Sequence, residues 1–136
     1  TIVDDNKIGI TGFCMGGRVT WLAAVSNLHF KAAVPFYGGF IFDRWGDVIN
    51  SPFELSHQLN CPMMFHFGSI DPNPSLSDME IFDKELTRLD KPHQFFEYPD
   101  ADHRFMDYTF DNFQAEAANL SWTRTLDFFK VHLKNY

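Results

Sequence analysis

Four short apolar runs stand out along the chain, and each has the length of a β-strand. They cover residues 7–11, 31–37, 62–67 and 93–98, and clusters rich in Gly, Pro, Asn and Asp border them. The third run is apolar on both alternating faces, which is typical of a strand buried in a parallel sheet. Pro35 lies inside the second run, and because proline has no N–H for a strand ladder, we expect an irregular strand end there.

Apolar positions at helical spacing follow three of these runs. Residues 19–25 are predicted to form a helix that lies on the sheet. Ser77 and Glu80 have the spacing of a capping box and predict the start of a second helix, which Lys91 and Pro92 end. The apolar stripe of that helix is Met79, Phe82, Leu86 and Leu89. A third helix is predicted to begin near Asp111, with a core-facing stripe of Trp122, Leu126, Phe129 and Leu133.

This alternation of strands and helices predicts an α/β fold: a mainly parallel sheet with helices on its faces. The 136 residues are enough for one domain with a real core and too few for two, so we expect a single domain over residues 1–136. Residues 40–59 interrupt the alternation with an aromatic, irregular stretch. We expect one helical turn over residues 54–59 and a loop that lines a pocket or caps the core.

Cys14 occupies the point at which the first strand turns into the first helix. Residues 12–17 read Gly-Phe-Cys-Met-Gly-Gly, which is a nucleophile elbow with cysteine in the usual serine position. We expect Gly12 and Gly16 to be required because a Cβ at either position would clash, and we expect a strained positive φ at Cys14. Sγ would then stand above the carboxyl end of the sheet, where the first turn of a helix favours a thiolate. The alternative is a small buried hydrophobic residue, as free cysteines often are.

Charge and composition exclude several classes of protein. The net charge is −7, and no basic stripe offsets it, so we expect no nucleic-acid partner. No apolar run approaches the ~20 residues of a membrane helix, and we expect no membrane association. The two cysteines, Cys14 and Cys61, are too few for a secreted disulfide scaffold, so a reducing cytoplasm is the expected compartment. Cys61, next to Pro62 at a strand entrance, is expected to be structural.

Asp71 and His103 join Cys14 as candidates for chemistry because each follows a predicted strand. Ligand sites of parallel sheets lie outside the carboxyl ends of the strands, so the three side chains are expected to meet. Their order along the chain is that of α/β hydrolases. We expect His103 to take the thiol proton and later protonate the leaving group, Asp71 to orient His103, and the N–H of Met15 to stabilise the oxyanion.

Each partner also has a simpler interpretation: a loop histidine is often only solvated, and an aspartate before proline is often a turn former. The remaining histidines lack the spacing of metal ligands, so we expect no metal site. They are His29, His57, His66, His93 and His132.

The same segments give the chain a resemblance to the dienelactone hydrolase family. The motifs are the elbow at 12–17, Tyr37-Gly38, Gly68-x-x-Asp71, Tyr98-Pro99-x-Ala101-x-His103-x-Phe105, and the closing segments 115–118 and 122–129. The resemblance covers essentially the whole chain, which is similar to the carboxyl-terminal half of the family's α/β-hydrolase fold. It implies a Cys–His–Asp triad that acts on small-molecule esters or lactones without a cofactor. It also implies that the second oxyanion donor belongs to the half that this chain does not match.

Two positions depart from the family pattern. Arg104 stands where the family usually has glycine after the catalytic histidine, and Asp107 stands where dienelactone hydrolase has a substrate-binding arginine. Arg104 is a candidate substitute for that arginine. We therefore take Tyr37, Arg104 and Phe105 as the expected substrate-binding residues.

Two further hypotheses remain open. The first is a catalytically incomplete half-fold that acts as an interaction subunit or is a truncated chain. The second is a thioesterase or acyl transferase that uses the same elbow. Under any of them, the first strand has only one neighbour in the chain, so we expect a second chain to cover its edge at Ile8 and Ile10.

Overall fold

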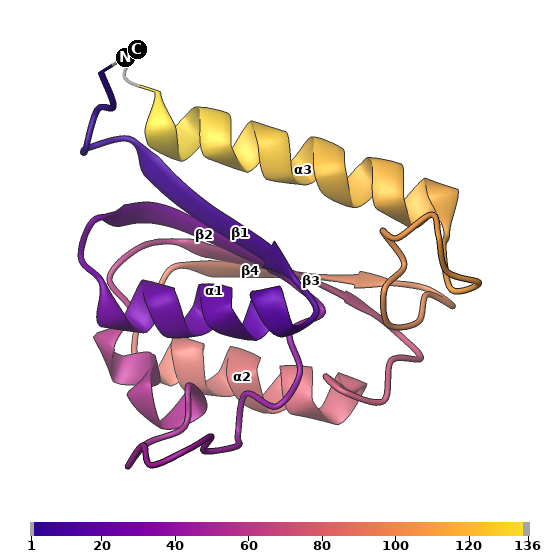
Figure 1. Ribbon diagram of the computed structural model, residues 1–136, viewed down its shortest axis with the longest axis horizontal. Coiled ribbons are helices and arrows are strands. Elements are labelled where there is room, and N and C mark those ends of the chain that lie inside the picture. Colours follow the sequence, from indigo (N-terminus) through magenta and orange to yellow (C-terminus); the bar gives the residue numbers. More distant parts are fainter. Residues whose placement is uncertain (1, 135–136) are drawn as a thin grey trace.

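The computed structural model describes residues 2–134 and shows a four-stranded sheet between two layers of helices (Figure 1). All neighbouring strands are parallel, in the order β1-β2-β3-β4, which confirms the predicted α/β architecture. Within the described residues β1 pairs with β2 alone, so β1 is an edge strand. The strands are β1 (Ile8–Phe13), β2 (Phe30–Phe36), β3 (Met63–Gly68) and β4 (His93–Tyr98).

The helices divide between the two faces of the sheet. α1 (Met15–Ser26) and α2 (Leu76–Arg88) cover one face, and α3 (Ala115–Leu133) crosses the other (Figure 1). A short 3-10 helix, η1 (Phe53–Gln58), packs beside α1 and α2. No helix within residues 2–134 is both long and apolar enough to cross a membrane.

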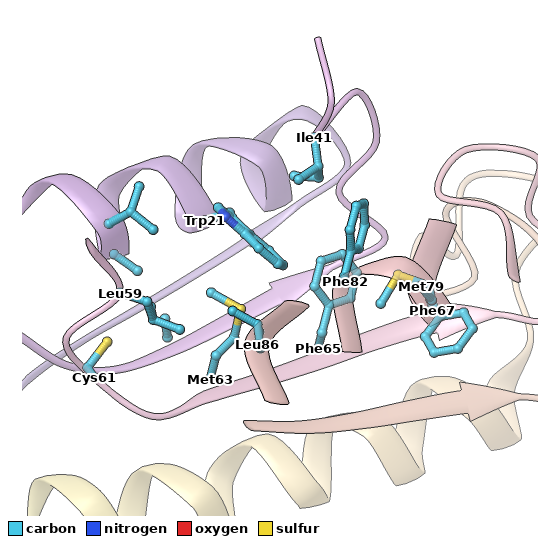
Figure 2. Packing of buried hydrophobic residues seen from close by; sticks show 13 residues of the cluster. Trp21, Ile41, Leu59, Cys61, Met63, Phe65, Phe67, Met79, Phe82 and Leu86 are labelled. Atoms are coloured by element: carbon cyan, nitrogen blue, oxygen red, sulfur yellow. The ribbon is translucent and has the colours of Figure 1, made fainter. Parts of the chain in front are cut away.

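The core under α1 and α2 is aromatic. Trp21 of α1 is fully buried, and its ring lies 6.1 Å from that of Phe65 and 5.3 Å from that of Phe82 (Figure 2). The indole N–H donates to the carbonyl of Pro52 at 3.1 Å. This bond satisfies a polar group inside the core and ties α1 to the segment that precedes η1.

The start of α2 differs from the expected capping box at Ser77 and Glu80. Ser75 caps the helix: its hydroxyl accepts from the N–H of Asp78 at 3.1 Å, and its own N–H donates to the Asp78 carboxylate at 2.9 Å. Both serines have an acidic residue three positions later, and the helix uses the earlier pair. α2 therefore begins at Leu76, two residues earlier than a cap at Ser77 would place it.

The third helix begins at Ala115, so the expected start near Asp111 is wrong. Turns fill the preceding loop, and the N–H of Gln114 donates back to the carbonyl of Phe105 at 3.0 Å. The expected core stripe is also wrong in part, since Trp122 and Leu126 are 40% and 44% exposed. The buried side chains of α3 are Phe128 and four small ones, Ala117, Ala118, Ser121 and Thr125.

A buried polar network explains the face that α3 presents. His66 of β3 is fully buried, with Nε2 3.0 Å from the Thr125 hydroxyl and Nδ1 2.9 Å from the Tyr98 hydroxyl. The Thr125 hydroxyl donates to the carbonyl of Ser121, so it accepts from His66 Nε2–H, and Tyr98 donates to Nδ1. Burial lowers the pKa of His66 to about 3, which keeps the imidazole neutral.

Candidate active site

The elbow has the strained backbone that its sequence predicts. Cys14 has φ 59° and ψ −120°, and its N–H donates to the carbonyl of Phe36 on β2 at 3.1 Å. A Cβ at Gly12 would lie 2.2 Å from the carbonyl oxygen of Gly16, so glycine is required there. The expected requirement at Gly16 is wrong, because a Cβ would meet nothing within 4 Å. The close approach falls instead at Gly17, where a Cβ would lie 2.5 Å from the carbonyl oxygen of Phe36.

Cys14 lies directly before the first turn of α1. The first N–H groups of a helix have no acceptor within it, and the helix dipole adds partial positive charge at the same end. Met15, at 63% exposure, opens the helix beside the cysteine. As the first residue of α1, its N–H has no acceptor within the helix, and its role as an oxyanion donor stays a prediction.

The structure brings the three candidate residues into one chain of contacts. Cys14 Sγ lies 3.0 Å from His103 Nε2, and His103 Nδ1 lies 2.8 Å from Asp71 Oδ2. The Asp71 side chain is 1% exposed, whereas that of His103 is 26% exposed. The ring of His103 thus connects a buried carboxylate to a thiol at the surface of a cleft, which is the geometry of a nucleophile, a base and an orienting acid.

Asp71 uses its two carboxylate oxygens differently. Oδ2 accepts from His103, and Oδ1 accepts the N–H of Asn73 at 2.8 Å. The second bond is the aspartate turn that the Asp71-Pro72 sequence suggests, and it is compatible with the contact to His103, whose orienting role stays a prediction. The turn fixes the carboxylate at the rim of the sheet in the orientation that His103 needs.

The environment of His103 favours the imidazolium. The hydrogen bond to Asp71 is the largest cause, and together with the bond to Cys14 it raises the pKa of His103 to about 9 against the opposing effect of burial. At neutral pH His103 is therefore protonated, and its Nε2–H can donate to Cys14 Sγ.

Two clefts meet at Cys14. The first has a volume of about 430 Å³ and is lined by the triad residues together with Met15, Gly39, Phe40, Trp45, Pro72 and Asn73. The second has a volume of about 390 Å³ and is more polar, with walls of Phe13, Tyr37, Arg104, Met106, Asp107 and Tyr108. Volumes of this size are typical of small-molecule sites.

The three expected substrate-binding residues have different surroundings. Tyr37 lines the second cleft, and its ring packs edge-on against His103 at 5.1 Å. Arg104 lines the same cleft, but its guanidinium stacks on the Phe110 ring at 3.6 Å and pairs with Asp107 at 3.4 Å. Phe105 lies in neither cleft: it is fully buried in the core against Tyr98. The expectation for Phe105 is corrected to a packing role.

Phe40 and Trp45 line the first cleft and belong to the 40–59 stretch that was expected to line a pocket or cap the core, whereas sequence reasoning did not single out Asn73. The amide oxygen of Asn73 accepts the N–H of Phe40 at 3.0 Å, which joins the loop after β2 to the turn after β3. The aromatic composition of residues 40–59 was the available signal for Phe40 and Trp45, whereas nothing in the sequence pattern marked Asn73. No cluster of three or more His, Cys, Asp or Glu side chains that could hold a metal lies within residues 2–134.

Comparison with known proteins places this geometry in a family. The Dienelactone hydrolase family matches residues 1–133. The chain is 34% identical over 130 residues to the Escherichia coli O157:H7 protein named "Putative carboxymethylenebutenolidase", covering 95% of this chain and 48% of that protein. It is 30% identical over 129 residues to a Bradyrhizobium sp protein named "Probable 2-oxo-3-(5-oxofuran-2-ylidene)propanoate lactonase", covering 94% of this chain and 52% of that protein.

A solved structure agrees with both relatives. The "Putative Dienelactone Hydrolase from Klebsiella pneumoniae" superposes with a TM-score of 0.85 at 32% identity, over 93% of this chain and 52% of that one. The chain therefore spans about half the length of the relatives it matches. Since the family match extends over nearly every residue, the chain belongs to the dienelactone hydrolase family.

Proposed function

We propose that this chain carries the catalytic triad of a cysteine-dependent hydrolase of carboxylic esters or lactones. The observation that carries the proposal is the contact chain from Cys14 Sγ through the His103 ring to the buried Asp71 carboxylate, at 3.0 and 2.8 Å. Membership of a family whose relatives are named lactonase and carboxymethylenebutenolidase supports the substrate class. A reducing compartment such as the cytoplasm suits a site that depends on a free thiol.

The reaction follows in two steps. The Cys14 thiolate attacks the substrate carbonyl carbon, and the Met15 N–H donates to the resulting oxyanion. The His103 imidazolium gives its proton to the leaving oxygen as the C–O bond breaks, which leaves a thioester on Cys14. Neutral His103 then takes a proton from a water molecule, the hydroxide attacks the thioester, and Cys14 leaves as a thiolate.

A chromogenic ester tests the proposal. With p-nitrophenyl acetate we expect a burst of nitrophenolate of about one equivalent, followed by turnover, and an acetyl group on Cys14 by mass spectrometry. Cys61 is the internal control, because burial raises its pKa to about 11 and holds it as an unreactive thiol. A burst with no turnover would favour an acyl transferase that lacks its acceptor or an incomplete site, and acetylation of Cys61 with Cys14 unmodified would overturn the proposal.

The second candidate is a half-fold that acts only as an interaction subunit. The exposed edge of β1 favours it, as does the fact that the chain spans about half the length of its relatives. An unmodified Cys14 and the absence of any nitrophenolate release would support this candidate.

We also infer that another polypeptide segment covers the edge of β1 at Ile8 and Ile10. It would be either a segment equivalent to the remaining half of the relatives or a second copy of this chain. A parallel strand with one unpaired edge offers a template for association with another strand. Each backbone N–H or C=O group buried there without a hydrogen-bond partner lowers the free energy of unfolding by about 1–3 kcal/mol. Trp122 and Leu126 on the outer side of α3 add exposed apolar surface.

Light scattering on the purified chain checks this inference. We expect a mass above the 15.8 kDa of one copy, with association that increases with concentration. A stable 15.8 kDa monomer that unfolds cooperatively would show that the edge needs no cover.

A further inference from the structure

The first cleft beside Cys14 adjoins a larger groove along α1. Met15 and Trp45 line both cavities, so the groove lies next to the cleft that contains the candidate nucleophile. The groove has a volume of about 750 Å³, against about 430 Å³ for the cleft. Together they extend well beyond the space that a small acetyl group would need.

Apolar side chains from two elements form the walls of this groove. α1 contributes Val19 and Leu22, which are 52% and 37% exposed, and the loop after β2 contributes Val48 and Ile49, which are 54% and 81% exposed. Four exposed aliphatic side chains facing one groove form a patch that water solvates poorly. Asp47, Asn50 and Ser26 also line the groove.

Arg18 brings no free charge to the groove, because its guanidinium is already occupied. It donates to the carbonyl oxygens of Phe40 and of Asp43, the latter at 2.9 Å, and it stacks on the Trp45 ring at 3.9 Å. Arg18 is only 4% exposed. Its role is to hold the aromatic loop against α1, so that Trp45 remains the common wall of cleft and groove.

We propose that this groove binds the extended apolar acyl chain of an ester substrate whose carbonyl lies at Cys14. The inference rests on the proposed hydrolase function and specifies its substrate class. The position of the groove next to the Cys14 cleft, with Met15 and Trp45 at their common border, favours a substrate chain as the occupant, since a chain attached to a carbonyl at Cys14 would reach it. The second cleft, with Arg104 and Asp107, is the polar exit for the alcohol side of the ester.

A series of p-nitrophenyl esters measures the effect of chain length directly. With butanoate, hexanoate and octanoate, each below its critical micelle concentration, kcat/KM is expected to rise about twofold per methylene. This is roughly half the effect of complete burial, because the groove is open on one side. Octanoate has four more methylenes than butanoate, so the ratio of kcat/KM for octanoate to kcat/KM for butanoate is expected to be about 10 to 20.

Charged substitutions test whether the groove residues cause the effect of chain length, and a charged substitution outside the groove is the control. Val19→Glu and Ile49→Glu place a carboxylate where the chain would lie, and both positions are exposed enough to accept it. Each is expected to bring the octanoate-to-butanoate ratio down to about 1–3. Leu28→Glu is the control: Leu28 is 75% exposed and is not a groove residue, so it should leave the ratio unchanged.

The outcomes separate the two proposals. Hydrolysis of butanoate through Cys14 with a ratio near 1 in the parent protein would overturn the acyl groove and leave the hydrolase intact. Equal loss of the ratio in Leu28→Glu would also overturn it, because the effect would then be one of surface charge. A protein that acylates Cys14 with no ester of the series would overturn both.

Discussion

Replacing Cys14 by serine is expected to lower kcat/KM for a chromogenic ester by about 100-fold or more at pH 7 without disturbing the fold. The reason is the protonation state of His103, whose pKa of about 9 leaves only about 1% of the ring neutral at that pH. A thiolate needs no base in the first step, whereas a serine hydroxyl needs neutral imidazole to take its proton. The kcat/KM of the parent protein and that of Cys14→Ser should therefore change in opposite directions as the pH is raised.

The pH dependence makes this test specific. The activity of the parent is expected to fall above about pH 9, because His103 then loses the proton that the leaving group requires. The residual activity of Cys14→Ser is expected to rise toward the same pH. Circular dichroism and thermal unfolding check that the fold is unchanged. If Cys14→Ala hydrolyses the ester as fast as the parent, the elbow is not the catalytic site.

The parts of the site predicted from sequence are those that local geometry determines. The Gly-x-Cys-x-Gly pattern between an apolar run and a helix specifies a strained turn, and Cys14 has the positive φ that this turn requires. Asp71 and His103 follow strands whose carboxyl ends meet at one edge, so parallel pairing alone brings them near Cys14. Neither inference needs knowledge of side-chain packing.

The features that sequence did not predict depend on tertiary contacts. The buried face of α3 follows from His66, whose Nε2–H donates to the hydroxyl of Thr125, so that Thr125 rather than the larger Trp122 faces the sheet. Hydrophobic periodicity cannot detect this, because it assumes that the sheet beneath a helix is apolar. The burial of Phe105 also depends on a tertiary contact. The turns of its loop bring its ring against Tyr98.

The apolar groove is also a tertiary feature. The loop after β2 has no regular structure over much of its length, and its path over α1 depends on one buried arginine with two carbonyl acceptors. Arg18 stands in the helix sequence as an ordinary basic residue, and no local pattern distinguishes it from a solvated one. The proposed acyl groove thus depends on contacts between segments that are far apart in the sequence.

Asp71→Asn is expected to preserve the fold and to lower kcat/KM by about 10²- to 10⁴-fold. An amide at this position can donate to His103 Nδ1, which stabilises the neutral tautomer with its proton on Nε2, so that Nε2 has no lone pair with which to take a proton from Cys14 or from water. The variant also removes the largest cause of the raised pKa of His103, so the alkaline limb of the pH profile should move below pH 9. The stability that protonated His103 contributes is present in full below pH 6.5 and is lost as pH rises through 9, so this loss should also begin earlier in the variant.

Asp102→Asn is the matched control for Asp71→Asn. Asp102 precedes His103 directly, and its carboxylate accepts the backbone N–H of His103 at 2.6 Å rather than either ring nitrogen. An asparagine oxygen can accept the same backbone N–H, so kcat/KM should stay within about threefold of the parent and the alkaline limb should stay near pH 9. If Asp71→Asn is silent while Asp102→Asn is damaging, the orienting acid is Asp102 and the contact between Asp71 and His103 has no catalytic role. Both variants could instead lose activity while the alkaline limb of the pH profile stays near pH 9. In that case the two aspartates only support the loop, and the raised pKa of His103 has another cause.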